Sequence, residues 1–248
     1  MTPPTPSRDT PAGRAYNDLR NLAKRQNRDP AEYITLYALE GFLARLSASE
    51  SAGDFVLKGG VLMAAFTDRR PTRDIDFAAR GFDNDITEVE KRVRNILSVP
   101  RDDGLEFDLD SVSGEQIRDE ADYNGVRVKM TARLATAQVA LHIDANFGDP
   151  IWPEPTEAVL PLLLGGSLRL LGYPDHMVLA EKIVTALERG EQNTRWRDFT
   201  DIAAIAHSRT VKGAELQEAI SVVAHHRKVE LEPLGPLLTE MPTLAQRK

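Results

Sequence analysis

The stretch 55–77 constrains the fold more than any other part of the sequence. Its first four residues are a short, mainly apolar run that predicts a strand, which ends at Gly59 and Gly60. Residues 61–66 predict a helix that starts directly after the two glycines, and residues 72–78 alternate as in a second strand. Two strands this close along the chain belong in one sheet, so the sequence predicts an α/β fold with a tight glycine turn beside it.

The second of these strands carries two carboxylates, Asp74 and Asp76. Because side chains alternate along a strand, the two lie on the same face. Like charges held this close are unfavourable unless a cation lies between them. Oxygen ligands with room for water and phosphate suit magnesium, and the backbone amides of Gly59 and Gly60 suit a nucleotide phosphate. The pattern therefore predicts a phosphoryl-transfer site.

A third carboxylate, Asp144, follows the largely apolar run 139–143. In two-metal transfer, carboxylates hold two ions about 4 Å apart, and one ion activates the attacking hydroxyl. We therefore expect Asp144 to lie on a neighbouring strand and to act as a base or as a metal ligand. The alternative is a strand-terminal aspartate that caps the next turn.

The remaining pattern predicts an α/β (α+β) protein, with a small mixed sheet, flanking helices and a mostly helical C-terminal half. We expect residues 1–13 to be a disordered arm, 14–150 to contain the N-terminal helices and the catalytic core, and 151–248 to be a mainly helical domain. The predicted helices cover residues 14–26, 31–51, 86–97, 174–189, 197–206 and 213–226. The predicted strands cover residues 105–112, 123–134, 137–146 and one or two segments within 160–171.

Composition excludes several classes of protein. Thirty-one Lys and Arg against 38 Asp and Glu give a net charge of −7, which argues against coating nucleic acid through net charge alone. The absence of cysteine excludes a disulfide framework, a thiolate zinc site and a cysteine nucleophile. No apolar stretch approaches the roughly 20 residues that span a bilayer, so we expect a cytoplasmic protein.

The C-terminal half offers two further candidates, Lys182 and Asp198. Lys182 lies in an otherwise largely apolar predicted helix, where it could bind phosphate or pair with a neighbouring carboxylate. Asp198 and Asp201 are three residues apart and share a helix face approximately. Either aspartate could complete the site, or simply pair with Arg195 or Arg197. The residues alone leave these alternatives open.

The glycine doublet, thirteen residues and then Asp74-Ile-Asp76-Phe77 are similar to the signature of the polymerase β-like nucleotidyltransferase superfamily. The more specific strings Leu57-Lys-Gly-Gly-Val-Leu62 and Arg70-Pro-Thr-Arg-Asp-Ile-Asp-Phe77 resemble the AbiEii/AbiGii toxin family, which includes the MenT toxins. The segments 179–189 and 197–202 look like the family's lysine-bearing helix and its downstream Arg-Asp segment. The resemblance extends from about residue 55 to residue 202.

The resemblance implies a magnesium-dependent nucleotidyltransferase toxin of a toxin–antitoxin or abortive-infection system. Such a toxin transfers a nucleotide from a nucleoside triphosphate to the 3′ end of transfer RNA, which blocks aminoacylation, and its antitoxin is encoded nearby. The implied catalytic residues are Asp74, Asp76, Asp144, Lys182 and Asp198, and the first three are the implied ligands of one or two magnesium ions. The nucleotide-binding residues that we expect are Lys58, Gly59, Gly60, Arg70, Thr72 and Lys182, and Lys58 could equally cap the sheet edge.

Two positions qualify the resemblance. Many relatives carry serine where this chain has Gly60, which keeps the backbone amide but has no hydroxyl. Thr72 stands where relatives carry a serine or threonine that can be phosphorylated, and a phosphate there would repel an incoming triphosphate. The resemblance therefore makes Thr72 a candidate regulatory site as well as a nucleotide contact.

Two alternatives remain. The first is a nucleotidyltransferase that acts on a small molecule or on a protein hydroxyl, which a closed acidic pocket would favour over an open basic cleft. The second, of another class, is a non-catalytic binding module with the same fold. The retention of Asp74, Asp76, Asp144 and Lys182 together counts against this second alternative.

Overall fold

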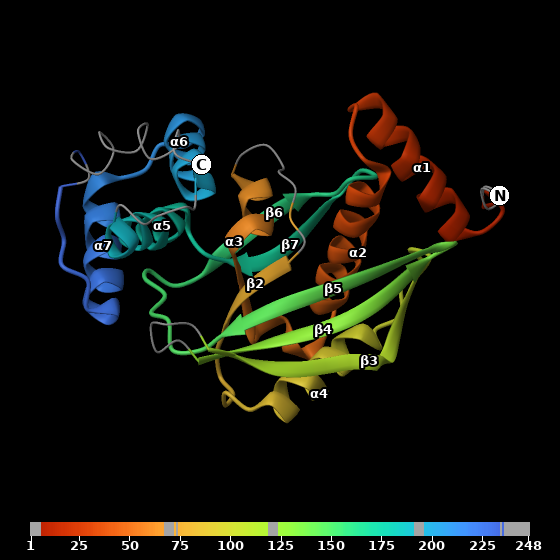
Figure 1. Ribbon diagram of the computed structural model, residues 1–248, viewed down its shortest axis with the longest axis horizontal. Helices are drawn as coiled ribbons and strands as arrows, with labels where there is room; N and C mark the ends of the chain where they lie inside the picture. Colours follow the sequence, from red (N-terminus) through yellow and green to blue (C-terminus); the bar gives the residue numbers. More distant parts are fainter. Residues whose placement is uncertain are drawn as a thin grey trace. The chain divides into compact units, whose positions relative to one another are not determined.

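A seven-stranded mixed sheet is the main feature of the computed structural model, which describes residues 6–66, 72, 74–118, 124–190, 196–233 and 235 (Figure 1). The strand order is β3-β4-β5-β2-β1-β7-β6. Strand β2 pairs parallel with β5 and antiparallel with β1, β1 pairs parallel with β7, and β3, β4 and β5 pair antiparallel. The mixed α/β fold class predicted from the sequence is confirmed. The strands are β1 (Phe55–Lys58), β2 (Asp74–Ala79), β3 (Leu105–Arg118), β4 (Asn124–Leu134), β5 (Ala137–Asn146), β6 (Thr156–Pro161) and β7 (Ser167–Gly172).

The chain divides into two compact units, and the division differs from the domain boundary predicted after residue 150. The first unit comprises Met1–Gly148 and Glu157–Gly172, and the second comprises Asp149–Thr156 and Tyr173–Lys248. Strands β6 and β7, which we assigned to the C-terminal domain, extend the sheet of the first unit through the pairing of Leu57 with Gly172. Both strands join this sheet because every second residue along them is apolar, and these side chains are buried against the core of the first unit.

Helices of the first unit cover one face of β3, β4 and β5 (Figure 1). α2 contacts β4 and β5, and α4 contacts β3 and β4. The sheet residues on this face are almost fully buried, among them Val128 and Ile143. The opposite face of these strands therefore carries their polar side chains. The helices are α1 (Pro11–Arg25), α2 (Pro30–Leu46), α3 (Gly59–Leu62) and α4 (Ile86–Leu97), with 3-10 turns at Glu50–Gly53 and Met63–Ala65.

Local capping decides where α1 and α2 begin. Thr10 accepts a hydrogen bond from the Gly13 backbone N–H, and Asp29 accepts one from Ala31, and in each case a proline follows in the first turn. The helix α1 starts at Pro11, so residues 11–13, which we predicted to belong to the disordered arm, are helical. The second helix ends at Leu46, before the predicted residue 51, because a separate 3-10 turn follows.

Two elements near the glycine doublet and the sheet edge differ in length from the prediction. The helix predicted over residues 61–66 is a four-residue helix that starts at Gly59 and continues as a 3-10 turn. The strand predicted over residues 105–112 continues to Arg118, and its register shifts between Asp108 and Ser113. This irregularity interrupts the alternation along the strand, which explains why the sequence pattern suggested an earlier end.

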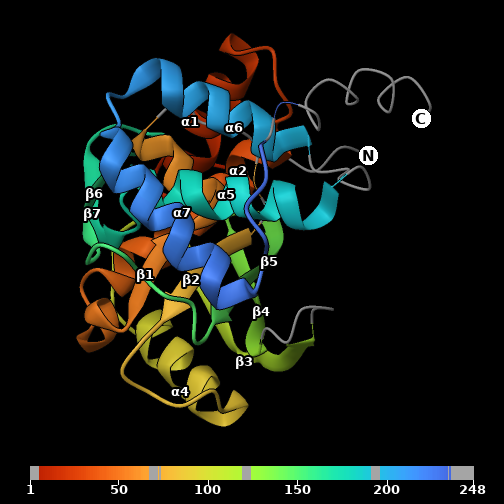
Figure 2. The same cartoon turned by 90° about the vertical axis from the view of Figure 1, so that its left-hand side faces the viewer.

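The second unit is mainly helical, as predicted (Figure 2). Its helices are α5 (Asp175–Arg189), α6 (Trp196–Ser208) and α7 (Gly213–Arg227), and α5 contacts both others. Pro174 precedes α5, and Gly190 ends it with a φ of 50°. Among the described residues, no helix is both long and apolar enough to cross a membrane.

A buried ion pair ties α2 to the segment before β3. Arg45 donates to both carboxylate oxygens of Asp103, at 2.6 and 3.1 Å, and to the Gly41 carbonyl at 2.9 Å. The Arg45 side chain is only 4% exposed. The Tyr37 hydroxyl donates to the Asp103 carbonyl, and burial, followed by the charges of Asp103 and Glu40, raises the pKa of Tyr37 to about 12. This pairing compensates a buried arginine that would otherwise oppose folding.

Replacement of Asp103 by alanine is therefore expected to lower the free energy of unfolding by about 3–5 kcal/mol, because it leaves the Arg45 charge buried without compensation. Urea denaturation followed by circular dichroism measures the change. Asp102→Ala, at the exposed neighbouring position, is the matched control and should stay within about 0.5 kcal/mol of wild type. Equal losses in the two variants would contradict the role of the ion pair.

Candidate functional site

The register of β2 and β5 brings together carboxylates that lie far apart in the sequence. On β2, Ile75 and Phe77 are fully buried, whereas Asp74 and Asp76 lie on the opposite face and are partly exposed. In the parallel pairing with β5, Asp76 is the register partner of Asp144. Register partners of adjacent strands share a face, so the three predicted carboxylates lie on one face of the sheet. No group of three acidic, histidine or cysteine side chains in the described ranges is arranged to hold a metal ion.

The carboxylate of Asp74 is oriented by its neighbours. Thr72 donates from its hydroxyl to Asp74 Oδ1 at 2.8 Å, and the residue is only 8% exposed. On the other side, His142 Nε2 lies 4.0 Å from Asp74 Oδ2. The Asp74 side chain itself is 43% exposed. Thr72, which we expected to contact a nucleotide, thus also positions a candidate metal ligand.

Arg127 binds Asp144, and the sequence analysis did not identify it. From β4, it donates through Nε to Asp144 Oδ1 at 2.8 Å and through Nη2 to Asp144 Oδ2 at 2.7 Å. The two residues are register partners on adjacent antiparallel strands. Because the Asp144 carboxylate accepts these hydrogen bonds, the pKa of Arg127 is raised further above its usual value. The only sequence signal is that Arg127 alternates with the apolar Val126 and Val128, which predicts its face but not its partner.

Gly59 makes a close approach that no other residue type would allow. Its φ of 67° lies in the left-handed region, and a Cβ atom built on it would lie 1.9 Å from Asp76 Oδ2. The preceding residue, Lys58, is buried and is the register partner of Asp76. Gly60 follows in the first turn of α3. The glycine turn, Lys58 and Asp76 are therefore packed against one another, as the predicted phosphate site requires.

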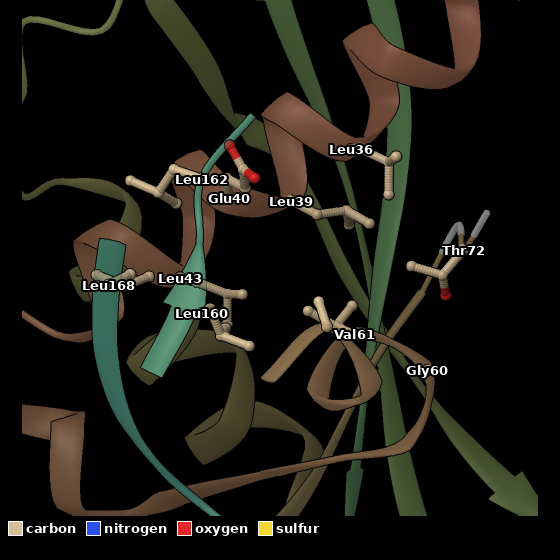
Figure 3. Close-up of a pocket in the computed structure, with 11 residues that line it drawn as sticks. Leu36, Leu39, Glu40, Leu43, Gly60, Val61, Thr72, Leu160, Leu162 and Leu168 are labelled. Carbon is tan, nitrogen blue, oxygen red and sulfur yellow. The ribbon is translucent and has the colours of Figure 1, made fainter. Parts of the chain in front are cut away.

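An apolar pocket lies beside Gly60 and Thr72 (Figure 3). In the figure, leucine side chains of α2, β6 and β7 gather to one side of Val61, and Thr72 lies on the other side. Among the described residues, the carboxylate that lines it belongs to Glu40, which accepts a hydrogen bond from the Leu163 backbone N–H at 3.0 Å. Its leucines are Leu36, Leu39, Leu43, Leu160, Leu162 and Leu168.

In the second unit, Lys182 lies between two aspartates. Its Nζ is 2.8 Å from Asp198 Oδ1 and 2.8 Å from Asp201 Oδ2. The three side chains are 5–11% exposed. The expected common face of Asp198 and Asp201 is confirmed, and both pair with the lysine. The lysine thus links α5 to α6 through two ion pairs, while its role with nucleotide stays a prediction.

Two predicted contacts lie outside the described residues. Arg70, expected to bind nucleotide, belongs to the segment 67–71, and Arg195 belongs to the segment 191–195. The remaining predicted residues, Lys58, Gly59, Gly60, Thr72, Asp74, Asp76, Asp144, Lys182 and Asp198, are all described.

The family model described as "Nucleotidyl transferase AbiEii toxin, Type IV TA system" matches residues 41–247 of the chain. Among solved structures, an antigenic nucleotidyltransferase-like protein from Paracoccidioides brasiliensis is 14% identical, with a TM-score of 0.46 and coverage of 80% of this chain and 94% of that chain. JHP933 from Helicobacter pylori is 11% identical, with a TM-score of 0.38 and coverage of 87% and 97%. No curated protein matches significantly.

Gly59→Ala should lower the free energy of unfolding by about 1–2 kcal/mol, the cost of a left-handed conformation for a residue with a Cβ atom. The displacement of Asp76 adds to this cost. Urea denaturation measures the loss. Gly53→Ala is the matched control, because Gly53 has an ordinary φ and a Cβ atom there would meet nothing within 4 Å. A loss no larger than that of the control would contradict the close approach.

Lys182→Ala should lower the free energy of unfolding by about 3–5 kcal/mol, because it removes a cation that pairs with two buried carboxylates. The control is Arg189→Ala, at an exposed position in the last turn of the same helix. Thermal melting of both variants checks the difference, and a Lys182 variant as stable as the control would contradict the structural role. Activity assays of Lys182 variants should be run at temperatures below the melting temperature of each variant, so that unfolding is not mistaken for loss of catalysis.

Proposed function

The chain belongs to the AbiEii family of nucleotidyl transferase toxins of type IV toxin–antitoxin systems, and from this premise we propose that it transfers a nucleotide from a nucleoside triphosphate to the 3′ end of transfer RNA. The proposal includes a dependence on magnesium and a block of aminoacylation. Its main support in the structure is that Asp74 and Asp76 lie on one face of β2, against the turn at Gly59.

Asp74 and Asp76 fit a magnesium ion. Magnesium usually takes one or two protein carboxylates and completes its octahedral shell with water and substrate phosphates. Two aspartates on one strand face supply such a pair, and Asp74 is exposed enough to meet a substrate. When bound, the ion would offset phosphate charge and polarise the phosphorus that is attacked. Thr72 would hold one Asp74 oxygen and leave the other for the ion.

The phosphate contacts of the proposal come from the turn after β1. Gly59 and Gly60 expose backbone N–H groups with no side chain in the way, and such groups bind phosphate oxygens. Helix α3 has only four residues, so its dipole contributes little and the amides themselves carry the interaction. Lys58 adds a positive charge on the same face as Asp76. These groups would align the triphosphate and stabilise the departing pyrophosphate.

An RNA acceptor is supported by local positive charge in the first unit. On the polar face of β4, Arg127, Lys129 and Arg133 recur at every second or fourth residue. On α1, which packs against β4, Arg14, Arg20, Lys24 and Arg25 are exposed. Since the whole chain has a charge of −7, contacts with an RNA backbone would have to come from such local cations, of which Arg127 and Lys129 are each paired with a carboxylate.

The acceptor distinguishes this proposal from its closest alternative. A nucleotidyltransferase for cationic small molecules needs an acidic acceptor pocket, whereas one for RNA needs an open basic cleft. A type IV toxin implies an antitoxin partner, and we propose that it is encoded nearby and that the protein works in the cytoplasm. Lys182 and Asp198 enter the proposal as further nucleotide-binding and catalytic groups on the strength of the sequence resemblance.

The test is an incubation with magnesium, each of the four labelled nucleoside triphosphates and total transfer RNA. We expect label at the RNA 3′ end and loss of aminoacylation. Asp76→Asn should reduce labelling at least a thousandfold, because it removes a ligand on which charge stabilisation depends. Asp83→Asn, the same change on an exposed loop, is the matched control and should retain wild-type labelling.

Other outcomes discriminate the alternatives. Label on protein or on a small molecule, with none on RNA, would support the other acceptor classes. No label on any acceptor, with Asp76→Asn indistinguishable from wild type, would contradict the enzyme and favour a binding module.

A further inference from the structure

We propose that Arg127 is a phosphate-binding residue of this site, and that Asp144 holds its guanidinium in place rather than binding a metal ion. The inference rests on the proposed function for its substrate, a phosphate of the triphosphate or of the RNA backbone. It changes the role expected for Asp144 and adds a residue that the sequence did not single out.

The geometry of Asp144 does not fit a metal ligand. Both of its oxygens accept hydrogen bonds from Arg127, at 2.8 and 2.7 Å, and its side chain is only 11% exposed. A divalent ion on either oxygen would lie beside the guanidinium, and two cations this close repel each other. Magnesium also requires near-ideal octahedral geometry, which a carboxylate held in a two-point arginine pair does not readily supply. Asp74 and Asp76 carry no such restriction from Arg127.

The geometry of Arg127 suits a phosphate. A guanidinium has five N–H donors, and the pair with Asp144 uses one on Nε and one on Nη2. Three donors remain, and the side chain is 35% exposed, so they are accessible. Planar paired donors match phosphate oxygens, which is why arginine is favoured at phosphate sites. The ion pair with Asp144 fixes the orientation of the Arg127 guanidinium before any substrate binds.

The position of Arg127 places it within reach of a phosphate bound at Asp76. Adjacent strands are about 4.8 Å apart, so β4 lies about 10 Å from β2, with β5 between them. The Arg127 side chain extends over β5 to reach Asp144, the register partner of Asp76. Its guanidinium is therefore about one strand spacing from the β2 carboxylates, a distance that a phosphate group can bridge.

The other charged groups on this face leave Arg127 available. Lys129, two residues further along β4, pairs with Glu115 of β3 at 2.7 Å. Glu115 is the register partner of Arg127, but it accepts a hydrogen bond from Lys129. His142 lies next to Asp74. The face thus alternates carboxylates and cations across the strands, and Arg127 is the β4 cation in register with Asp144 and Asp76.

The first experiment measures metal binding directly, through Mn²⁺ titration followed by electron paramagnetic resonance. Asp76→Asn is expected to weaken Mn²⁺ binding about tenfold or more, whereas Asp144→Asn should leave it within about twofold of wild type. A loss in Asp144→Asn equal to that in Asp76→Asn would overturn the inference, because Asp144 would then be a ligand. Thermal melting of each variant shows that it is folded.

The second experiment measures phosphate binding with two probes, inorganic triphosphate with Mn²⁺ and total transfer RNA alone. Arg127→Met should weaken one of them about tenfold or more, the usual loss for a charge-assisted hydrogen bond, and the probe that weakens identifies which phosphate Arg127 binds. Arg127→Lys should recover only part of the loss. Arg169→Met, which removes another arginine paired with a carboxylate on a strand of the same unit, is the control and should affect neither probe.

A double variant separates positioning from direct binding. If Asp144 acts through Arg127, Asp144→Asn should have no further effect on probe binding in the Arg127→Met background. Unchanged binding of both probes in Arg127→Met would overturn the inference. These binding measurements need no turnover, so the expected losses would support the assignment of Arg127 even if no acceptor were ever labelled. Failure of the Arg127 assignment can therefore be distinguished from failure of the proposed nucleotidyl transfer.

Discussion

The parallel pairing of β2 with β5 is the interaction on which the site depends. It aligns Asp76 with Asp144 and Asp74 with His142, and it places the apolar residues between them on the opposite, buried face. A slip of one residue would turn the carboxylates into the core and Ile75 and Phe77 out of it. The burial of those apolar side chains thus stabilises the same register that assembles the polar site.

The pairing also concentrates negative charge, which by itself opposes folding. The neighbouring strands offset it with cations: Lys58 on β1 is the register partner of Asp76, and Arg127 on β4 pairs with Asp144. The first of these is next to the glycine turn, where only a residue without a side chain fits against Asp76. Cations on both neighbouring strands therefore offset part of this negative charge, while the Asp74 side chain stays partly exposed.

The second unit solves a similar problem with a buried cluster. Lys182 on α5 lies between Asp198 and Asp201 of α6 and joins the two helices. This geometry agrees with one of the alternatives that the sequence left open, in which Lys182 pairs with a neighbouring carboxylate. Because loss of this ion pair is expected to destabilise the unit, stability measurements belong beside any activity assay of Lys182 variants, since activity alone would not separate the two effects.

The sequence by itself determined the elements whose signals are local. The amphipathic period of α4 predicted residues 86–97, and the alternation of β5 predicted residues 137–146, in agreement with the structure. The pairs Arg127–Asp144, Lys182–Asp201 and Leu57–Gly172 were decided only by the tertiary structure. Period and capping depend on residues a few positions apart, whereas strand order and ion pairing join distant segments, and the free energy that selects them comes from burying the whole sheet.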